Sequence, residues 1–168
     1  ICHAGATPVF VDSDPDSWLM SIDALEAAIT PNTKAVMCVH LYMGVSNVDR
    51  IRAICDSHKL IMIEDCAEAL GSTYNNMHVG TLADVASFSF FGNKTITTGE
   101  GGMVASSNPK IIDKIRKLKN QGLSETKEYY YDVLGYNFRM TNICAAIGCA
   151  QLEKIDQILS KKRNLYNQ

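Results

Sequence analysis

Two polar segments that follow apolar runs carry side chains capable of acid–base and covalent chemistry. Glu64 and Asp65 come directly after the apolar residues 60–63, and Lys94 comes shortly after the apolar run at residues 85–91. In open α/β sheets, ligands bind beyond the carboxyl ends of the strands, so these are the positions where a site is expected. An acid at one strand end and a lysine at another could therefore meet at a single ligand.

This combination of residues suits pyridoxal phosphate. The cofactor needs a lysine amine for its Schiff base and a carboxylate that keeps the pyridine nitrogen protonated. Its phosphate needs hydroxyl or backbone N–H donors, and Ser87 or Ser89 lies in the same run that leads to Lys94. The spacing alone leaves alternatives open, because an isolated lysine is usually solvated and Asp65 could instead cap a helix beginning at Cys66.

Alternating strands and helices must bring these segments to one edge of a sheet. The predicted strands are residues 35–39, 60–63, 85–91 and 103–105. The first two are continuously apolar, which is typical of strands buried on both faces of a parallel sheet. Helices are predicted from Ser21, Asn47 and Asn108, where apolar residues recur at helical spacing. The sequence therefore predicts an α/β fold, a mainly parallel sheet with helices on both faces.

The remaining segments have less regular patterns. Residues 8–11 form a short apolar run that predicts a strand, and the polar, tyrosine-rich residues 123–136 predict a long loop. Thr141 is the predicted cap of a last helix, whose amphipathic pattern continues to Tyr166 with no glycine or proline to end it. Because the sequence also starts abruptly at Ile1, we expect it to be a piece of a longer chain.

Composition fits one globular domain and argues against several classes of protein. The 168 residues are 46% hydrophobic and 20% charged, with 16 Lys and Arg against 18 Asp and Glu. At this length a full core can form without metal or disulfide, and the near balance of charge favours no nucleic-acid partner. A bilayer span needs about 18 consecutive apolar residues, and neither such a run nor a signal peptide is found. The sequence thus predicts a cytoplasmic protein without a membrane partner.

Cysteine and histidine, the side chains that most often bind metals, are predicted to be structural. No two of the six cysteines form a C-x-x-C pair, and most lie in apolar runs such as residues 36–39 and 143–146. Cysteine in such a run acts as a small hydrophobic residue, so we expect reduced, buried thiols and no metal. His40 follows a predicted strand and could line a pocket, but a hydrogen-bonded structural histidine is the simpler interpretation.

Motifs along nearly the whole chain resemble those of the DegT-type sugar aminotransferases, which are fold-type I pyridoxal phosphate enzymes acting on nucleotide-linked keto sugars. The longest are residues 64–69 (EDCAEA), 87–102 (SFSFFGNKTITTGEGG) and 135–142 (GYNFRMTN). Shorter matches lie at residues 5–12, 39–42 and 150–153. The resemblance implies that residues 1–168 are part of the large cofactor-binding domain, without its N-terminal segment and the small C-terminal domain.

The resemblance also implies roles for five residues. Lys94 would form the Schiff base with pyridoxal 5′-phosphate and later move a proton to the sugar carbon, and Asp65 would pair with the pyridine nitrogen. Ser89 would bind the cofactor phosphate, and Glu68 would lie near the cofactor ring. Asn137 would reach the cofactor phosphate of a neighbouring subunit, which implies a homodimer with shared sites. From the residues alone, Ser89 could instead bond the sheet edge and Asn137 could be a turn residue.

Residues 90–104 are most similar to the members of this family that convert GDP-4-keto-6-deoxymannose to GDP-perosamine. The resemblance thus implies transfer of an amino group from glutamate to C4 of a nucleotide-linked 4-keto-6-deoxy sugar. UDP- or dTDP-linked 4-keto-6-deoxyglucose is the alternative substrate, and a cofactor-binding regulator without turnover is the alternative function. A Rossmann oxidoreductase is not supported, because no predicted strand leads into G-x-G-x-x-G. The family commonly has Gly-Gln after Tyr42, where this sequence has Met43-Gly44, so we expect a reshaped loop beside the sugar site.

Overall fold

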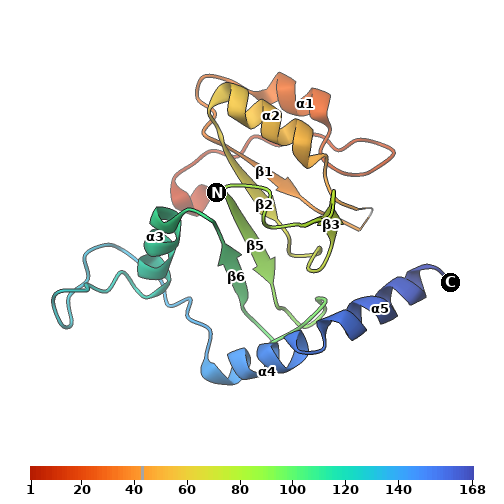
Figure 1. Ribbon diagram of the computed structural model, residues 1–168. Coiled ribbons are helices and arrows are strands. Elements are labelled where there is room, and N and C mark those ends of the chain that lie inside the picture. Colours follow the sequence, from red (N-terminus) through yellow and green to blue (C-terminus); the bar gives the residue numbers. More distant parts are fainter. Residues whose placement is uncertain (43) are drawn as a thin grey trace.

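A four-stranded sheet lies at the centre of the molecule, which a computed structural model describes at residues 1–42 and 44–168 (Figure 1). The strands are β1 (Ala35–Val39), β2 (Ile61–Asp65), β5 (Val85–Ser89) and β6 (Gly102–Ala105), in the order β1-β2-β5-β6. β1, β2 and β5 run parallel, and β6 is antiparallel to β5. The prediction of an α/β fold with a mainly parallel sheet is confirmed.

Two helices pack on one face of β1 and β2. α1 (Ile22–Ala28) and α2 (Val48–His58) begin where predicted, and the side chains of Ser21 and Asn47 each accept a hydrogen bond from a first-turn N–H. The buried residues of this core are Leu25, Val36, Cys38, Val48, Ile51, Ile54, Cys55, Leu60 and Met62. Because every second strand residue faces these helices, the core fixes which side chains point the other way.

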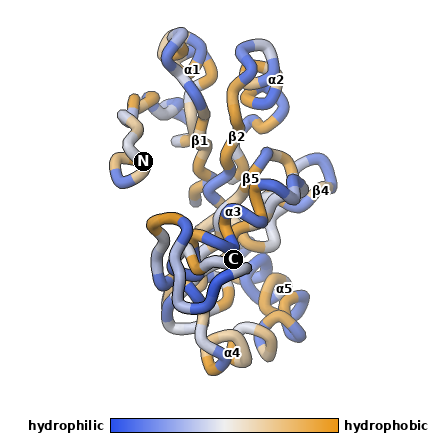
Figure 2. The backbone as a smooth tube through the Cα atoms, turned by 90° about the vertical axis from the view of Figure 1, so that its left-hand side faces the viewer, coloured by the Kyte–Doolittle hydropathy of each residue, from blue (hydrophilic) through white to orange (hydrophobic). Residues whose placement is uncertain are grey.

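The opposite face of the sheet is more open than the sequence predicts. Met37 is 39% exposed although its neighbours Val36 and Cys38 are buried, and Ile61 is exposed beside the buried Met62. Figure 2 shows β1 and β2 as mainly apolar segments next to α1 and α2. The prediction that both faces are buried is therefore wrong for the described residues, because only one face of these strands is closely packed.

Two predicted elements of the chain termini also differ. Residues 8–11, all of them described, form no strand, and Val9 and Phe10 are exposed because no neighbouring strand pairs with them. The chain instead begins with a short 3-10 turn, η1 (Cys2–Ala4). At the other end the predicted single helix is divided into α4 (Asn142–Leu152) and α5 (Ile155–Tyr166), because Lys154 leaves the helical conformation with φ −112°. Thr141 caps α4 as predicted.

The connections after β2 and β6 are partly as predicted. α3 (Pro109–Lys119) starts with its proline in the first turn, and residues 123–136 form a long loop. An unpredicted hairpin of β3 (Thr73–Tyr74) and β4 (Met77–His78) joins β2 to β5. Asn75 and Asn76 both have positive φ, 49° and 64°, which is typical of a two-residue type I′ turn. The Asn-Asn pair in the sequence was the signal that could have predicted this turn. None of the helices in the described ranges is long and apolar enough to cross a bilayer.

Candidate active site

Lys94 lies in a turn just beyond the carboxyl end of β5. Its backbone N–H donates to the carbonyl of Phe91 at 3.1 Å, and its side-chain amine forms an ion pair with Glu68. The side chains of Lys94 and Glu68 are 15% and 26% exposed, respectively. The lysine is therefore shielded and paired, so the alternative of a solvated surface lysine is wrong. The structure brings these two predicted site residues into direct contact.

Asp65 is the last residue of β2, and Ser89 is the last residue of β5, the parallel strand beside it. Asp65 is opposite Ser87 in the register of β2 and β5, and strand alternation places Asp65 and Ser89 on the face away from α1 and α2. Oδ1 of Asp65 accepts a hydrogen bond from the N–H of Ala67 at 3.0 Å, whereas Oδ2 has no partner among the described residues. The hydroxyl of Ser89 accepts a hydrogen bond from Phe91 at 3.3 Å. Each side chain thus keeps hydrogen-bonding capacity for a ligand.

The structure also tests the alternative that Asp65 caps a helix beginning at Cys66. The hydrogen bond to Ala67 is of the kind that a capping side chain makes. Residues 66–71, however, form a turn and not the helix that this alternative required. Asp65 therefore stabilises the turn that carries Glu68 toward Lys94, and one oxygen remains open to a ligand.

A cavity of about 970 Å³ opens beside Lys94 and Glu68. Its walls are the loop after β1, the turn after β2, the turn that carries Lys94 and the C-terminal part of α5. Tyr42 and Gly44 belong to the first of these walls. Met43, where the sequence departs from the family pattern, lies outside the described residues. The cavity is large enough for a cofactor-sized ligand.

The α5 wall of this cavity is cationic. Leu159 packs against Gly71, where an added Cβ would come within 2.6 Å of the leucine side chain. Gly71 has a φ of +87°, a second reason why this position needs glycine. Further along α5, Lys162 and Arg163 line the cavity, and neither makes an ion pair with any described residue. Two positive charges thus lie in the same cavity as Lys94.

Gln151 holds the turn that follows Lys94 against α4. Its Oε1 accepts the N–H of Thr97 at 3.0 Å, and its Nε2 donates to the carbonyl of Thr97 at 2.5 Å. Figure 1 shows α4 and α5 crossing the end of the sheet toward which β5 points. The sequence pattern alone indicates no role for Gln151, although this residue lies within the family match at residues 150–153.

Asn137 does not join this group within the chain. It forms an isolated bridge with Asn120, just after α3, and it does not line the cavity that contains Lys94. Its expected contact with the cofactor phosphate of a neighbouring subunit stays a prediction.

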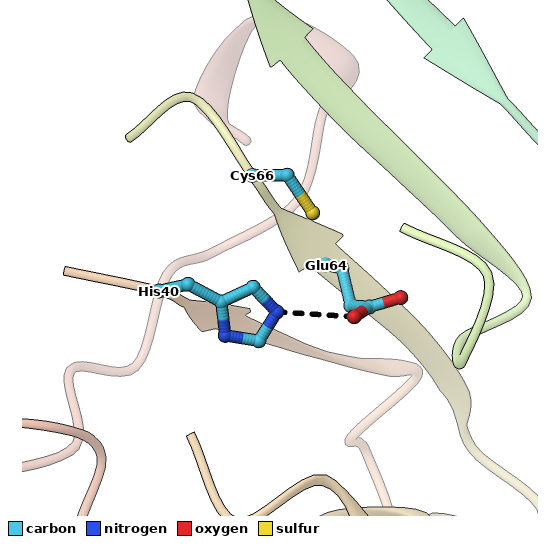
Figure 3. A group of neighbouring side chains, drawn as sticks. All are labelled: His40, Glu64 and Cys66. Atoms are coloured by element: carbon cyan, nitrogen blue, oxygen red, sulfur yellow. Dashed lines mark hydrogen bonds and ion pairs between the residues drawn. The ribbon is translucent and has the colours of Figure 1, made fainter. Parts of the chain in front are cut away.

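A second polar group lies on the other face of the β2 end (Figure 3). His40 and Glu64 are completely buried, with His40 Nε2 3.0 Å from Glu64 Oε1. His40 Nδ1 accepts the N–H of Ser46 at 3.2 Å, and Glu64 Oε2 accepts the N–H groups of Leu82 and Ala83 at 3.1 and 3.0 Å. Burial alone would raise the pKa of Glu64, but the hydrogen bonds from His40 and from backbone N–H groups lower it overall. The interpretation of His40 as a satisfied structural histidine is confirmed.

The same group shows how a metal-like cluster can be purely structural. His40, Glu64 and Cys66 have their ligand atoms within 4.8 Å of one another. Both ring nitrogens and both carboxylate oxygens are already engaged, however, and burial raises the pKa of the Cys66 thiol well above its ordinary value.

The prediction of buried thiols is wrong for Cys2 and Cys149, which are exposed, while all six cysteines are unpaired.

Comparison with known proteins places these residues in a family context. The whole chain, residues 1–168, matches the DegT/DnrJ/EryC1/StrS aminotransferase family. GDP-perosamine synthases from Escherichia coli O157:H7 and Vibrio cholerae are 53% and 51% identical over 165 residues, covering 98% of this chain and 45% of theirs. The PLP form of a putative sugar aminotransferase, Spr1654 from Streptococcus pneumoniae, superposes with a TM-score of 0.92 at 32% identity, over 99% of this chain and 48% of that one. The chain thus spans about half the length of the relatives it matches.

Proposed function

Because the chain belongs to the DegT/DnrJ/EryC1/StrS aminotransferase family, we propose that the protein uses pyridoxal 5′-phosphate to move an amino group from glutamate to C4 of a nucleotide-linked 4-keto-6-deoxy sugar. GDP-4-keto-6-deoxymannose is the proposed substrate, and GDP-perosamine is the product. The observation that carries the proposal is the shielded Lys94 amine, paired with Glu68 in a cavity whose walls include the turn that follows Asp65. Similarity to two GDP-perosamine synthases supports the GDP-linked sugar over its UDP and dTDP counterparts.

The polar groups around Lys94 fit this cofactor. When bound, pyridoxal phosphate supplies an electron-accepting ring that stabilises negative charge on the carbon next to nitrogen. The free Oδ2 of Asp65 is available to the protonated pyridine nitrogen, and the Ser89 hydroxyl at the adjoining strand end is available to the phosphate. The chain thus offers partners for the aldehyde, the pyridine nitrogen and the phosphate of the cofactor near the carboxyl ends of β2 and β5.

Lys94 would carry the proton, and Glu68 would hold the Lys94 amine. The lysine must lose a proton before its nitrogen can act as a nucleophile, and it must regain one to act as an acid. Glu68 contacts the Lys94 amine directly, so we assign it the role of orienting that nitrogen and stabilising its protonated form. Gln151 keeps the turn after Lys94 against α4, which holds the amine in reach of the cavity.

The cationic wall of the cavity supports a phosphate-bearing substrate. Lys162 and Arg163 of α5 lack carboxylate partners among the described residues, and both kinds of side chain bind phosphate oxygens strongly. Since the whole chain has a net charge of −2, attraction of an anionic nucleotide sugar depends on such local groups.

We also propose that the protein acts as a homodimer in the cytoplasm. Asn137 matches a family position that contacts the neighbouring subunit, and within this chain it lies apart from the cavity of Lys94. A shared site would give this residue its function. The cytoplasm suits the six unpaired cysteines, because thiols stay reduced there.

Borohydride reduction followed by peptide mapping of the complete protein tests the proposal. We expect the cofactor on the peptide that contains Lys94. We also expect amino transfer from glutamate to GDP-4-keto-6-deoxymannose to fall at least about 100-fold in Lys94→Ala. Lys114→Ala, an exposed lysine of α3, is the control and should behave as wild type. A cofactor adduct on another lysine, or unaltered turnover in Lys94→Ala, would contradict the proposal, and faster amination of the UDP- or dTDP-linked sugars would contradict the substrate.

A further inference from the structure

We propose that Glu64 and His40 are positioning residues for Asp65. They form a buried, fully hydrogen-bonded pair that fixes the carboxyl end of β2 from the face opposite the candidate cofactor site. The inference rests on the proposed function in one respect, that Asp65 is the carboxylate facing the cofactor. It adds two residues that would act on the cofactor without touching it.

Glu64 connects three segments of the chain, and Figure 3 shows its contact with the first of them, at His40. One carboxylate oxygen contacts His40, directly after β1, and the other accepts the N–H groups of Leu82 and Ala83, in the loop that leads into β5. β1, β2 and β5 are adjacent parallel strands. A single buried carboxylate therefore links the end of β2 to the end of β1 and to the start of β5.

His40 supplies the direct link to Asp65. Its backbone N–H donates to the carbonyl of Asp65 at 3.1 Å, while its side chain bonds the carboxylate of the preceding residue, Glu64. Strand alternation then turns the side chain of Asp65 to the other face. Movement of the histidine or of Glu64 would consequently shift the backbone from which Asp65 projects.

The protonation pattern of this pair is fixed by its partners. Because His40 Nδ1 accepts a hydrogen bond from Ser46, the ring proton must be on Nε2, which donates to Glu64. Glu64 accepts at both oxygens, so it must be a carboxylate. A metal ion would have to displace these bonds, which leaves positioning as the function that the geometry supports.

Glu64→Gln disrupts the pair while preserving its shape. If the amide oxygen accepts from His40, the amide NH₂ faces the N–H groups of Leu82 and Ala83. If the amide is turned over, its NH₂ donates to Nε2, and the ring proton moves to Nδ1, where it faces the N–H of Ser46. Either arrangement sets two donors against each other, so no tautomer of His40 accommodates glutamine at position 64.

The test compares Glu64→Gln with Asp84→Asn in the complete protein. Asp84 is a matched control, because its carboxylate accepts the N–H of Met62 at 2.7 Å and so anchors the same strand near its other end. The first measurement is the dissociation constant of pyridoxal phosphate, obtained by absorbance titration of folded protein. The second is amide hydrogen exchange of residues 64–67 in cofactor-free protein. Neither measurement requires turnover.

We expect Glu64→Gln to weaken cofactor binding on the order of 10-fold and to speed exchange at residues 64–67. Asp84→Asn should lower stability yet keep the affinity of the wild type. If Glu64→Gln does not fold, His40→Leu replaces it, and His40→Gln, which retains a donor for Glu64, should restore most of the affinity.

Equal loss of affinity in Glu64→Gln and Asp84→Asn would overturn the inference, since it would show a general effect of stability. So would wild-type affinity and exchange in Glu64→Gln. Failure of the wild-type protein to bind the cofactor would instead contradict the proposed function, and hydrogen exchange at residues 64–67 would then decide the positioning role by itself.

Discussion

Glu64 and Asp65 are adjacent acids at one strand end, and they have opposite surroundings. Glu64 is completely buried among hydrogen-bond donors, whereas Asp65 lies on the open face, where its Oδ2 has no partner among the residues that the structure describes. Both acids are recognisable in the sequence as candidate site residues, but strand alternation shows only that they face opposite sides of the sheet. Which one is buried depends on the side where α1 and α2 pack, and this tertiary choice is not encoded in residues 60–65 themselves.

A second carboxylate, that of Asp84, holds β2 through the N–H of Met62, and this contact depends on the protonation of the carboxylate. Burial alone would raise the pKa of Asp84, but hydrogen bonds from the N–H of Met62 and from Arg52 lower it overall, as the bonds to Glu64 do for that residue. A carboxyl whose pKa is lower in the folded than in the unfolded state adds stability above its ordinary pKa. That stability is lost as the pH falls through the folded value.

We therefore expect the free energy of unfolding to decrease steeply in acid, below about pH 4.5, as Glu64 and Asp84 become protonated. Asp84→Asn should lower stability at pH 7 and flatten this dependence, because the amide does not titrate. Urea unfolding between neutral and acid pH measures both effects. Asp113→Asn, at an exposed position of α3, should leave the slope unchanged. Parallel curves for wild type and Asp84→Asn would rule out Asp84 as a source of the acid sensitivity.

Elements with strong periodicity and local caps were predictable, and elements set by tertiary contacts were not. α1 and α2 follow from Ser21, Asn47 and the apolar spacing behind them. The division between α4 and α5 has no glycine or proline to mark it, and α5 lies where Leu159 can pack against Gly71, far away in the sequence. The apolar periodicity of the sequence therefore could not predict the direction of α5, nor that α5 forms the cationic wall of the cavity.

This placement of α5 makes a prediction about substrate binding. Replacing Lys162 and Arg163 by glutamine should raise KM for the nucleotide-linked sugar on the order of 10-fold, because charge-assisted hydrogen bonds to phosphate are lost. The KM for glutamate should change little. Lys161→Gln is the matched control, since Lys161 precedes these two residues on α5 but does not line the cavity. Steady-state kinetics, together with calorimetric binding of GDP, separates these effects.

Equal changes in Lys161→Gln and in the double variant would show only the effect of net charge. An unchanged KM for the sugar and unchanged GDP binding in the double variant would remove α5 from the substrate site, while leaving the assignment of Lys94 intact.

At the scale of the whole molecule, the predicted site residues fall into two groups that one chain keeps apart. Lys94, Glu68 and Asp65 gather at the ends of β2 and β5, whereas Asn137 lies with Asn120 after α3. The sequence motifs identified both groups, but motif order along a chain carries no information on which subunit completes which site. The proposed homodimer with two shared sites would account for the separation.

Mixing of inactive chains tests this arrangement. In a homodimer with shared sites, a Lys94→Ala chain paired with an Asn137→Ala chain has one site that carries both defects and one that carries neither. Random pairing of equal amounts should then restore about a quarter of the wild-type activity, although each variant alone is impaired, provided the subunits are unfolded and refolded together. Activity that stays at the average of the two separate variants would mean that Asn137 serves its own chain or none. Restored activity requires that Asn137 acts across the subunit interface, because no other combination of these chains contains an intact site.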